Sequence, residues 1–250
     1  KSCSRDRIRL RLTHMKTNCS FLNPYLGAIA LMGMALSSAA WAGTSSGPTV
    51  VSNPQAKRDI VMIYPYEALL QGKTGWAEAS FVVDYAGRPL FTNASDASDP
   101  AFAKAAIAMI EANQYTPIKK DRRLSMTQAS QRVVFPGEAA LDPEAKRILS
   151  ELRKPTPAIC NQSELDARPK AVRQDAPVYP RAMKDDGLTG QAEIEFIVTS
   201  EGKVLFPHII SATQEDFGWA AAAAVAQWRF QPPTRNGHKV DVRMTVPVLF

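Results

Sequence analysis

The chain contains one sequence pattern twice, and this repeat limits its possible folds more than any other feature. Shifting the sequence by 115 residues aligns residues 64–135 with residues 179–250 without a gap, and about 20 of the 72 positions are identical. Most identical positions carry aromatic residues, glycines, prolines or alanines, and they include Tyr64/Tyr179, Pro65/Pro180, Gly75/Gly190, Phe81/Phe196, Gly87/Gly202, Phe102/Phe217, Pro117/Pro232 and Phe135/Phe250. Two copies are too few for a solenoid, so we expect a tandem duplication of one module.

Periodicity divides the second copy into elements. A short helix after Pro180 is expected to end at Gly187, because glycine is favoured just beyond a helix. Residues 190–198 alternate apolar and polar side chains, which indicates a half-buried strand. Gly202 supplies a turn with positive φ, and a second strand follows over residues 204–210.

A helix and a third strand complete the copy. The helix is expected over residues 217–230, with Thr213 and Asp216 as its capping box and with an apolar stripe of Phe217, Ala220, Ala221, Ala224, Val225 and Trp228. Alanines let this helix lie close to the sheet, while Trp228 and Phe230 fill the end of a thin core. Residues 238–250 alternate again and predict a strand. Each module is therefore helix, hairpin, helix and strand, which places the fold in the α+β class.

The segments outside the modules have different compositions. Met15 precedes an apolar run and the sequence Ala40-Trp41-Ala42, so residues 15–42 are expected to be a signal peptide cleaved after Ala42. Residues 1–14 then are interpreted as an untranslated upstream extension. The alternative is an uncleaved membrane anchor. Residues 43–57 are expected to be flexible, and the modules to span residues 58–136 and 177–250.

Residues 137–176 are expected to be a linker, since they are polar and interrupted by prolines. One short helix is predicted there, with Asp142 as N-cap and Pro143 at its first position. Cys160 also lies in this segment and is the one cysteine after residue 42. It is interpreted as an unpaired thiol, with a disulfide between two molecules as the alternative.

Charge and motifs argue against nucleic-acid binding and against an enzyme. The formal net charge of +6 comes mainly from residues 1–42, whereas the remainder has 24 basic and 23 acidic residues. A nucleic-acid role thereby loses its main support. His208 and His238 have no second ligand at metal spacing, and neither a nucleophile motif nor a phosphate loop is present. We therefore expect no catalytic residues, cofactor or metal.

The second copy resembles the TonB C-terminal domain family, the periplasmic end of the energy transducers of Gram-negative bacteria. The resemblance rests on "PVYPRAMKDDGLTG", "AEIEFIVTSEGKV", "AAAAVAQWRFQPPTRNG" and "VPVLF", which span residues 177–250. The first copy matches less closely, since Asn113 stands in place of Trp228. The resemblance implies a three-stranded antiparallel sheet that binds a short extended peptide, the TonB box of outer-membrane receptors, at its edge. The family's transducers also have an anchor containing a histidine, which residues 25–42 lack.

The expected binding site follows from the third strand. A strand that closes a small sheet leaves unpaired N–H and C=O groups, which another chain can pair with. Pro247 fits an edge position because proline donates no hydrogen bond. The candidate partner-binding residues are Val178, Tyr179, Pro180, Val240, Val242, Arg243, Met244 and Val246. The charges of Asp241 and Arg243 fit an edge protected from indiscriminate pairing.

Two alternatives concern this site. The edge could be blunted, or used for self-association in a homodimer. The Tyr179-Pro180 pair could be a chain-reversal element, because proline forces its predecessor to be extended, or it could contact the docked partner.

The sequence thus predicts an exported periplasmic protein that binds a receptor or another envelope protein by strand addition. The alternatives are a membrane-anchored energy transducer and a self-associating scaffold without a transport role. Strand addition predicts that Val242→Pro or Met244→Pro abolishes partner binding.

Overall fold

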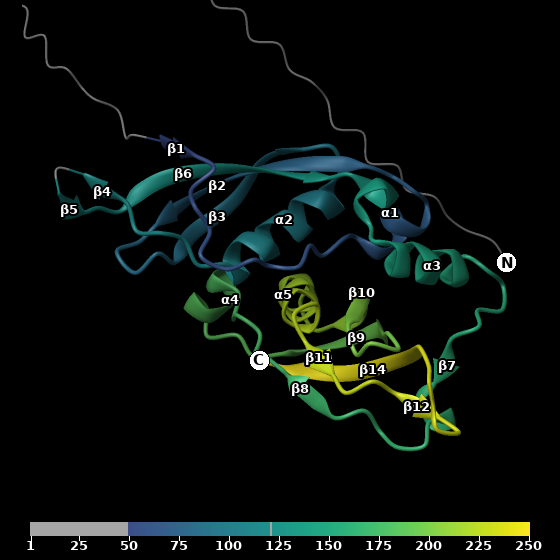
Figure 1. Cartoon of the computed structure of the whole chain (residues 1–250). Helices are drawn as coiled ribbons and strands as arrows, with labels where there is room; N and C mark the ends of the chain where they lie inside the picture. Colours follow the sequence, from purple (N-terminus) through teal and green to yellow (C-terminus); the bar gives the residue numbers. More distant parts are fainter. Residues whose placement is uncertain (1–49, 121) are drawn as a thin grey trace, which may run out of the picture. The chain divides into compact units, whose positions relative to one another are not determined.

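The computed structural model describes residues 50–120 and 122–250, and two modules with the same order of elements form most of this part (Figure 1). The first module contains α1 (Tyr66–Leu70), β2 (Gly75–Val83), β3 (Pro89–Ala97), α2 (Pro100–Ala112) and β6 (Thr127–Phe135). The second contains α4 (Arg181–Asp185), β9 (Gln191–Val198), β10 (Val204–Ala212), α5 (Glu215–Val225) and β14 (Val242–Leu249). The predicted α+β class and the tandem arrangement are confirmed.

Each module has three antiparallel strands with the first strand of the hairpin in the centre. The orders are β6-β2-β3 and β14-β9-β10. One short parallel strand extends each sheet, which the sequence did not predict. β1 (Val50–Ser52) pairs with β6, and β7 (Cys160–Asn161) pairs with β14. Residues 50–52 therefore form a strand, although they belong to the segment 43–57 that was expected to be flexible.

The N-terminal predictions stay open. The expected signal peptide and the cleavage site after Ala42 lie outside the described residues. Among the residues that the structure describes, no helix has both the length and the apolar composition needed to span a membrane.

In each module a glycine of the hairpin turn lies against the backbone of a residue a few positions beyond the longer helix. Gly202 has φ +79, and a Cβ there would lie 2.0 Å from the carbonyl oxygen of Phe230. The Phe230 N–H donates to the Gly202 oxygen at 2.9 Å. Gly87 and Tyr115, at the equivalent positions of the first module, show the same close approach and the same hydrogen bond, at 2.7 Å. Only glycine fits where the two backbones approach so closely.

The helix of the second module is shorter than predicted. α5 ends at Val225, and Arg229–Phe230 form the short strand β11, which pairs with β8 (Ala171–Arg173) of the linker. Trp228 lies beyond the helix end but is buried, and its Nε1–H donates to the Asp175 oxygen at 2.8 Å. The linker thus provides backbone partners that end the helix early.

The predicted capping box of α5 is wrong. Gln214 is the N-cap residue and makes no side-chain cap hydrogen bond. The Thr213 hydroxyl instead accepts the N–H of Gln191 at 3.1 Å, which joins the helix entry to the start of β9. The caps expected elsewhere are present: Asp99 accepts the N–H of Ala101, and Asp142 accepts that of Ala145 at the start of α3 (Pro143–Leu152).

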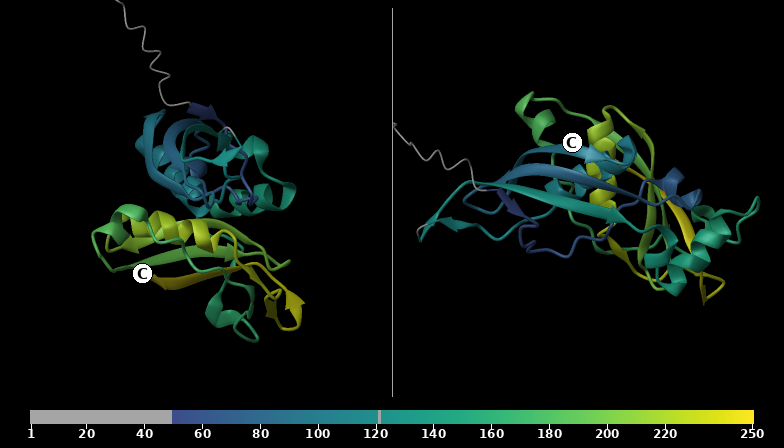
Figure 2. Two further views of the ribbon diagram at one scale, coloured as in Figure 1. Left: turned by 90° about the vertical axis from the view of Figure 1, so that its left-hand side faces the viewer. Right: turned by 90° about the horizontal axis from the view of Figure 1, so that it is seen from above.

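The two modules pack through their longer helices, α2 and α5, as two views show (Figures 1 and 2). Both modules belong to one compact unit. Ala223 of α5 and its C-cap residue Ala226 join a buried cluster with Phe102 and Ala106 of the first module. Lys104 of α2 lies 3.3 Å from Asp216 and 3.5 Å from Glu215. α5 is therefore buried against its own sheet and against α2, which explains why five successive alanines suit it.

Filling this interface should destabilise the protein. Ala223 is 1% exposed between α2 and α5, so Ala223→Leu forces the helices apart and should lower the free energy of unfolding by about 2 kcal/mol. Ala182→Leu, on the exposed surface of α4, is the control and should change it little. Chemical denaturation measures both, and equal stability of the two variants would exclude a tight helix pair.

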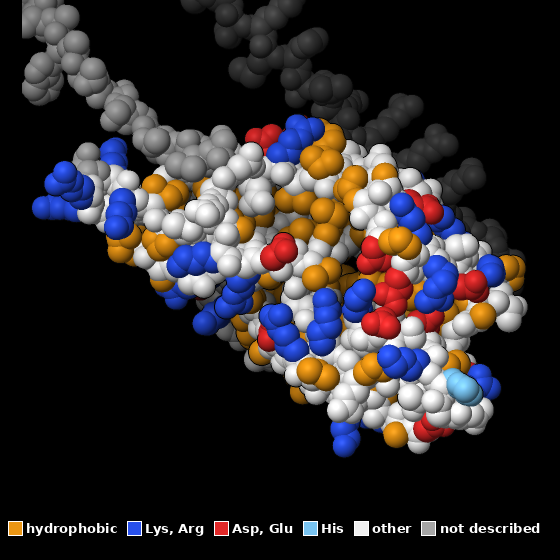
Figure 3. Space-filling view, in the orientation of Figure 1, with side chains coloured by type: hydrophobic (Ala, Val, Ile, Leu, Met, Phe, Trp, Pro, Cys, Tyr) orange, Lys and Arg blue, Asp and Glu red, His pale blue; other side chains and the backbone are white. Residues whose placement is uncertain are grey.

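Two small hairpins differ in how they are held. In the second module β12 (Thr234–Arg235) pairs with β13 (His238–Lys239), and Asp166 accepts the N–H groups of Asn236 and Gly237 at 2.7 and 3.0 Å. The equivalent hairpin of the first module, β4 (Lys119–Lys120) with β5 (Arg123–Leu124), carries a cluster of Lys and Arg side chains (Figure 3). Hydrogen bonds to the linker residue Asp166 therefore fix the second hairpin, whereas the first hairpin is distinguished by its positively charged side chains.

Candidate partner-binding edge

The backbone N–H and C=O groups of β14 point alternately toward β9 and toward the opposite edge of the strand. Phe250, just past the strand, exchanges both backbone hydrogen bonds with Gly190 ahead of β9, at 2.8 and 3.3 Å. On the opposite edge the Asp241 oxygen accepts the N–H of Cys160 at 3.0 Å. Since backbone groups alternate in direction along a strand, even-numbered residues of β14 bond to β9 and odd-numbered residues face the other edge.

Part of the outward edge carries no strand partner in residues 50–120 and 122–250. β7 pairs only with Val242 and Arg243. Beyond that point Thr245, Pro247 and Leu249 present the outward backbone groups, and all three residues are exposed. Thr245 and Leu249 each offer an N–H and a C=O, whereas Pro247 offers only a C=O. This part of the edge can therefore pair with another strand, except that Pro247 has no N–H to donate. Proline is common on edge strands for this reason.

The first module has an added strand at the equivalent edge. β1 runs parallel to β6 with Val50 opposite Gln128 and Ser52 opposite Ser130, and the N–H of Asn53 donates to the Ser130 oxygen at 2.7 Å. Ser130 aligns with Thr245 in the repeat. The third strand of this module type therefore accepts an extended segment at the position that is open in β14.

The predicted side chains on β14 divide into two groups. Val242 and Met244 are 0% and 2% exposed and pack in the core beneath α5. Val246 is half-buried against the same core. Arg243 points to the other face of the sheet, where its Nη1 lies 3.7 Å from Oε1 of Glu195. Val240 lies outside the strand, and its N–H donates to the Pro233 oxygen at 3.0 Å.

The expected effect of proline at Val242 or Met244 must be corrected. Both residues are buried and direct their backbone groups toward β9. Proline there would break the central ladder of the module, so lost binding would report unfolding. Thr245, which the sequence interpretation omitted, is the position where proline removes an outward donor.

Tyr179 belongs to an aromatic cluster at the far end of β14. Its ring meets Phe217 at 5.5 Å and Phe250 at 5.6 Å, both edge-on, and its hydroxyl donates to the Leu188 carbonyl. Tyr64 makes the same edge-on contacts with Phe102 and Phe135 at 5.6 and 5.5 Å. The repetition of this cluster favours a structural role for the tyrosine-proline pair.

The neighbours of Tyr179 differ in exposure. Pro180 is buried and is the N-cap residue of α4, whereas Val178 is exposed. The structure thus brings Tyr179 to the end of β14, while Val240 lies at the opposite end. Of the three segment residues, Val178 is the most exposed, Tyr179 is half-buried and Pro180 is buried.

Asp241 holds the beginning of β14 in place through its side chain and does not serve to prevent unwanted strand pairing. Its Oδ2 lies 2.8 Å from Nη2 of Arg147 on α3, and its Oδ1 accepts the N–H of Ser200 at 2.9 Å. The carboxylate is mostly buried and joins the linker helix, the hairpin turn and the third strand. This corrects the protective role expected from its charge.

Removing this carboxylate should loosen the start of the strand. Asp241→Ala leaves the Ser200 N–H without its partner and Arg147 without its ion pair, so we expect a loss of about 2 kcal/mol in the free energy of unfolding. Thermal or chemical denaturation measures the loss. Glu201→Ala, an exposed change in the same turn, should cost less than about 0.5 kcal/mol, and a similar cost for both would contradict the assigned role.

Cys160, His208 and His238 belong to no metal site in the part of the chain that the structure describes. Within residues 50–120 and 122–250, no group of three or more His, Cys, Asp or Glu side chains could hold a metal ion. Cys160 is a free thiol in β7, and its Sγ accepts a hydrogen bond from Nη1 of Arg235 at 3.6 Å.

In the part of the chain that the structure describes, the fold has two α+β modules, and part of the outer edge of β14 in the second module is unpaired. Residues 61–136 and 175–250 both match the family model for the Gram-negative bacterial TonB protein C-terminal region. Because these matches cover more than half of the chain, it belongs to the TonB C-terminal family. The less similar first module, identified from the repeat, is thereby a member of the same family.

Two relatives illustrate the similarity. Protein TonB of Pseudomonas aeruginosa is 31% identical over 86 residues, which are 34% of this chain and 25% of that protein. The chain therefore spans about a quarter of the length of this curated relative. The solution NMR structure of the Pseudomonas aeruginosa TonB CTD shares 28% identity, covers 37% of this chain and 93% of its own, and has a TM-score of 0.31.

Proposed function

We propose that the chain is a periplasmic, non-enzymatic protein of TonB-dependent transport, which binds a receptor or another envelope protein by strand addition to β14. The partner is an extended segment, such as the TonB box of an outer-membrane receptor. Family membership supports the role in the envelope. Export by a cleaved signal peptide, expected from residues 15–42, is part of the same proposal.

The observation that carries this proposal is the pairing of β1 with β6. A segment of the chain itself forms a ladder along the third strand of the first module, as far as Ser130. Thr245 occupies the same place in the second module and faces outward. Backbone hydrogen bonds supply most of the affinity in strand addition, and the side chains beside them supply specificity.

The side chains beside the open edge suit such a segment. Leu249 is 72% exposed and gives an apolar contact on the outer face of the sheet. Arg243 and Glu195 lie near its start and give paired charges. A bound strand of alternating apolar and polar residues would place one set of its side chains over this face.

Proline at Thr245 tests the proposal. Thr245→Pro removes an outward N–H but leaves the ladder with β9, because the N–H groups that donate to β9 belong to even-numbered residues. We expect at least about tenfold weaker binding of a receptor peptide in a calorimetric titration. Thr245→Val keeps the N–H and is the matched control.

One outcome would contradict strand addition at β14. If Thr245→Pro is folded and binds the peptide as tightly as Thr245→Val, strand addition at this edge is wrong. Circular dichroism and the midpoint of denaturation confirm that both variants are folded before the titrations are compared.

A further inference from the structure

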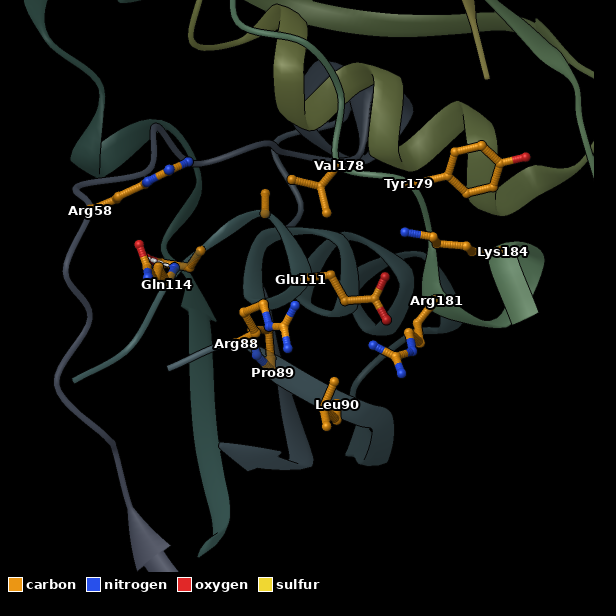
Figure 4. A pocket seen from close by; sticks show the side chains of 12 residues that line it. Arg58, Arg88, Pro89, Leu90, Glu111, Gln114, Val178, Tyr179, Arg181 and Lys184 are labelled. Atoms are coloured by element: carbon orange, nitrogen blue, oxygen red, sulfur yellow. Dashed lines mark hydrogen bonds between the residues drawn. The ribbon is translucent and has the colours of Figure 1, made fainter. Parts of the chain in front are cut away.

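A pocket of about 400 Å³ lies where residues of both modules meet, away from the backbone edge of β14. Figure 4 shows Glu111 from the end of α2 and Arg88 from the turn before β3 on one side. Val178 and two cations of α4, Arg181 and Lys184, approach from the second module. Arg58 of the first module also lines the pocket. A single module could not form this pocket, since each module supplies part of its wall.

The charges of the lining are unbalanced. Four cationic side chains, Arg58, Arg88, Arg181 and Lys184, surround one carboxylate, Glu111. Arg88 is paired with Asp84 at 2.8 Å and Arg181 with Asp185 at 3.3 Å. Arg58 and Lys184 have no ion pair within 4 Å among the residues described by the structure. Arg58 is within electrostatic range of Asp175, whose pKa is lowered mainly by its hydrogen bond from Arg173 and to a smaller degree by Arg58. Lys184 and, in part, Arg58 are therefore left to attract an anion.

The one carboxylate opposes an anion only weakly near neutral pH. Burial and, to a smaller degree, the nearby Asp216 carboxylate raise the pKa of Glu111 to about 7, against the effect of a hydrogen bond from the Arg181 backbone. Asp216 is itself paired with Lys104. A protonated Glu111 leaves the pocket with an excess of positive charge and a carboxyl group that can donate to an oxyanion.

We infer that this inter-module pocket binds a small oxyanion with at least two negative charges, such as a tricarboxylate or a phosphate. The volume falls in the range of small-molecule sites. Arginine and lysine at separate corners suit two charged groups, because guanidinium binds carboxylate and phosphate through paired hydrogen bonds. Such a ligand would bridge the modules and hold them in one arrangement.

Isothermal titration of the full chain with citrate and with inorganic phosphate, at fixed ionic strength and pH 7, tests this. We expect saturable binding of one or both anions. Lys184→Gln and Arg58→Gln should each weaken it about fivefold or more, while Lys146→Gln, an exposed lysine on α3, should leave it unchanged. Glu111→Gln should strengthen binding at pH 8, where the native carboxylate is ionised and repels the anion.

Two results would overturn the inference. One is the absence of saturable binding of both anions up to about 10 mM. The other is equal affinity of Lys184→Gln, Arg58→Gln and Lys146→Gln, which would mean that the anion binds elsewhere. Because none of these variants alters the edge of β14, receptor-peptide binding stays testable separately.

Discussion

Gly202→Ala should lower the free energy of unfolding by about 4 kcal/mol. The alanine would have to adopt φ near +79, which costs about 1 kcal/mol for a residue with a Cβ. The larger part comes from the Cβ itself, which would lie 2.0 Å from the Phe230 oxygen. Backbone must move to relieve this contact, and the hydrogen bond from Phe230 to Gly202 would be strained with it.

Gly187→Ala separates the two causes. Gly187 has φ +65, but nothing lies within 4 Å of the position of an added Cβ. Its substitution should therefore cost only about 1 kcal/mol. Urea denaturation of both variants gives the comparison. Equal costs would mean that the close approach of the turn to Phe230 does not exist in solution.

The second large effect is a dependence of stability on pH that comes from Glu111. Its folded pKa of about 7 lies above the ordinary value of 4.5. Below pH 4.5 the Glu111 carboxyl is protonated in both the folded and the unfolded state, so it does not lower the free energy of unfolding. As pH rises from 4.5 to 7, the unfolded chain loses its proton first, so the folded state loses stability, by up to roughly 3 kcal/mol above pH 7.

Glu111→Gln should remove this loss. The variant should match the native protein at pH 4.5 and be more stable by roughly 2–3 kcal/mol at pH 8. Glutamine keeps the oxygen that accepts the Arg181 N–H, so the change tests the charge alone. Other groups titrate equally in both proteins and cancel in the difference. A difference that is the same at both pH values would show that the carboxyl is not buried as described.

Local sequence signals predicted the interior of each module well. Turn glycines, the alternation in the strands and the repeat give the element order, because each depends on nearby residues. The end of α5 was predicted five residues too late, since its alanines and Trp228 continue the apolar pattern. The linker strand β8 ends the helix there, and such a distant partner leaves no periodic signal.

Three parts of the site could not be predicted. The short strands β1 and β7 pair through backbone groups, which are the same for every residue except proline. The charge of Asp241 suggested an exposed edge because its partner, Arg147, lies in a different segment. In an alanine-rich helix the faces differ little in hydrophobicity, so the apolar stripe of α5 did not show that a second face packs against α2. The pocket between the modules depends on this packing and was therefore not predicted either.

The pairing along β14 itself is best measured by amide hydrogen exchange on the full chain, with and without a receptor peptide. In the free protein the N–H groups of Thr245 and Leu249 should exchange fast, while those of Met244 and Val248 are already protected by β9. Strand addition predicts that the peptide slows exchange at Thr245 and Leu249 by at least about tenfold. If the peptide binds and these two amides still exchange as in the free protein, the partner does not add to β14.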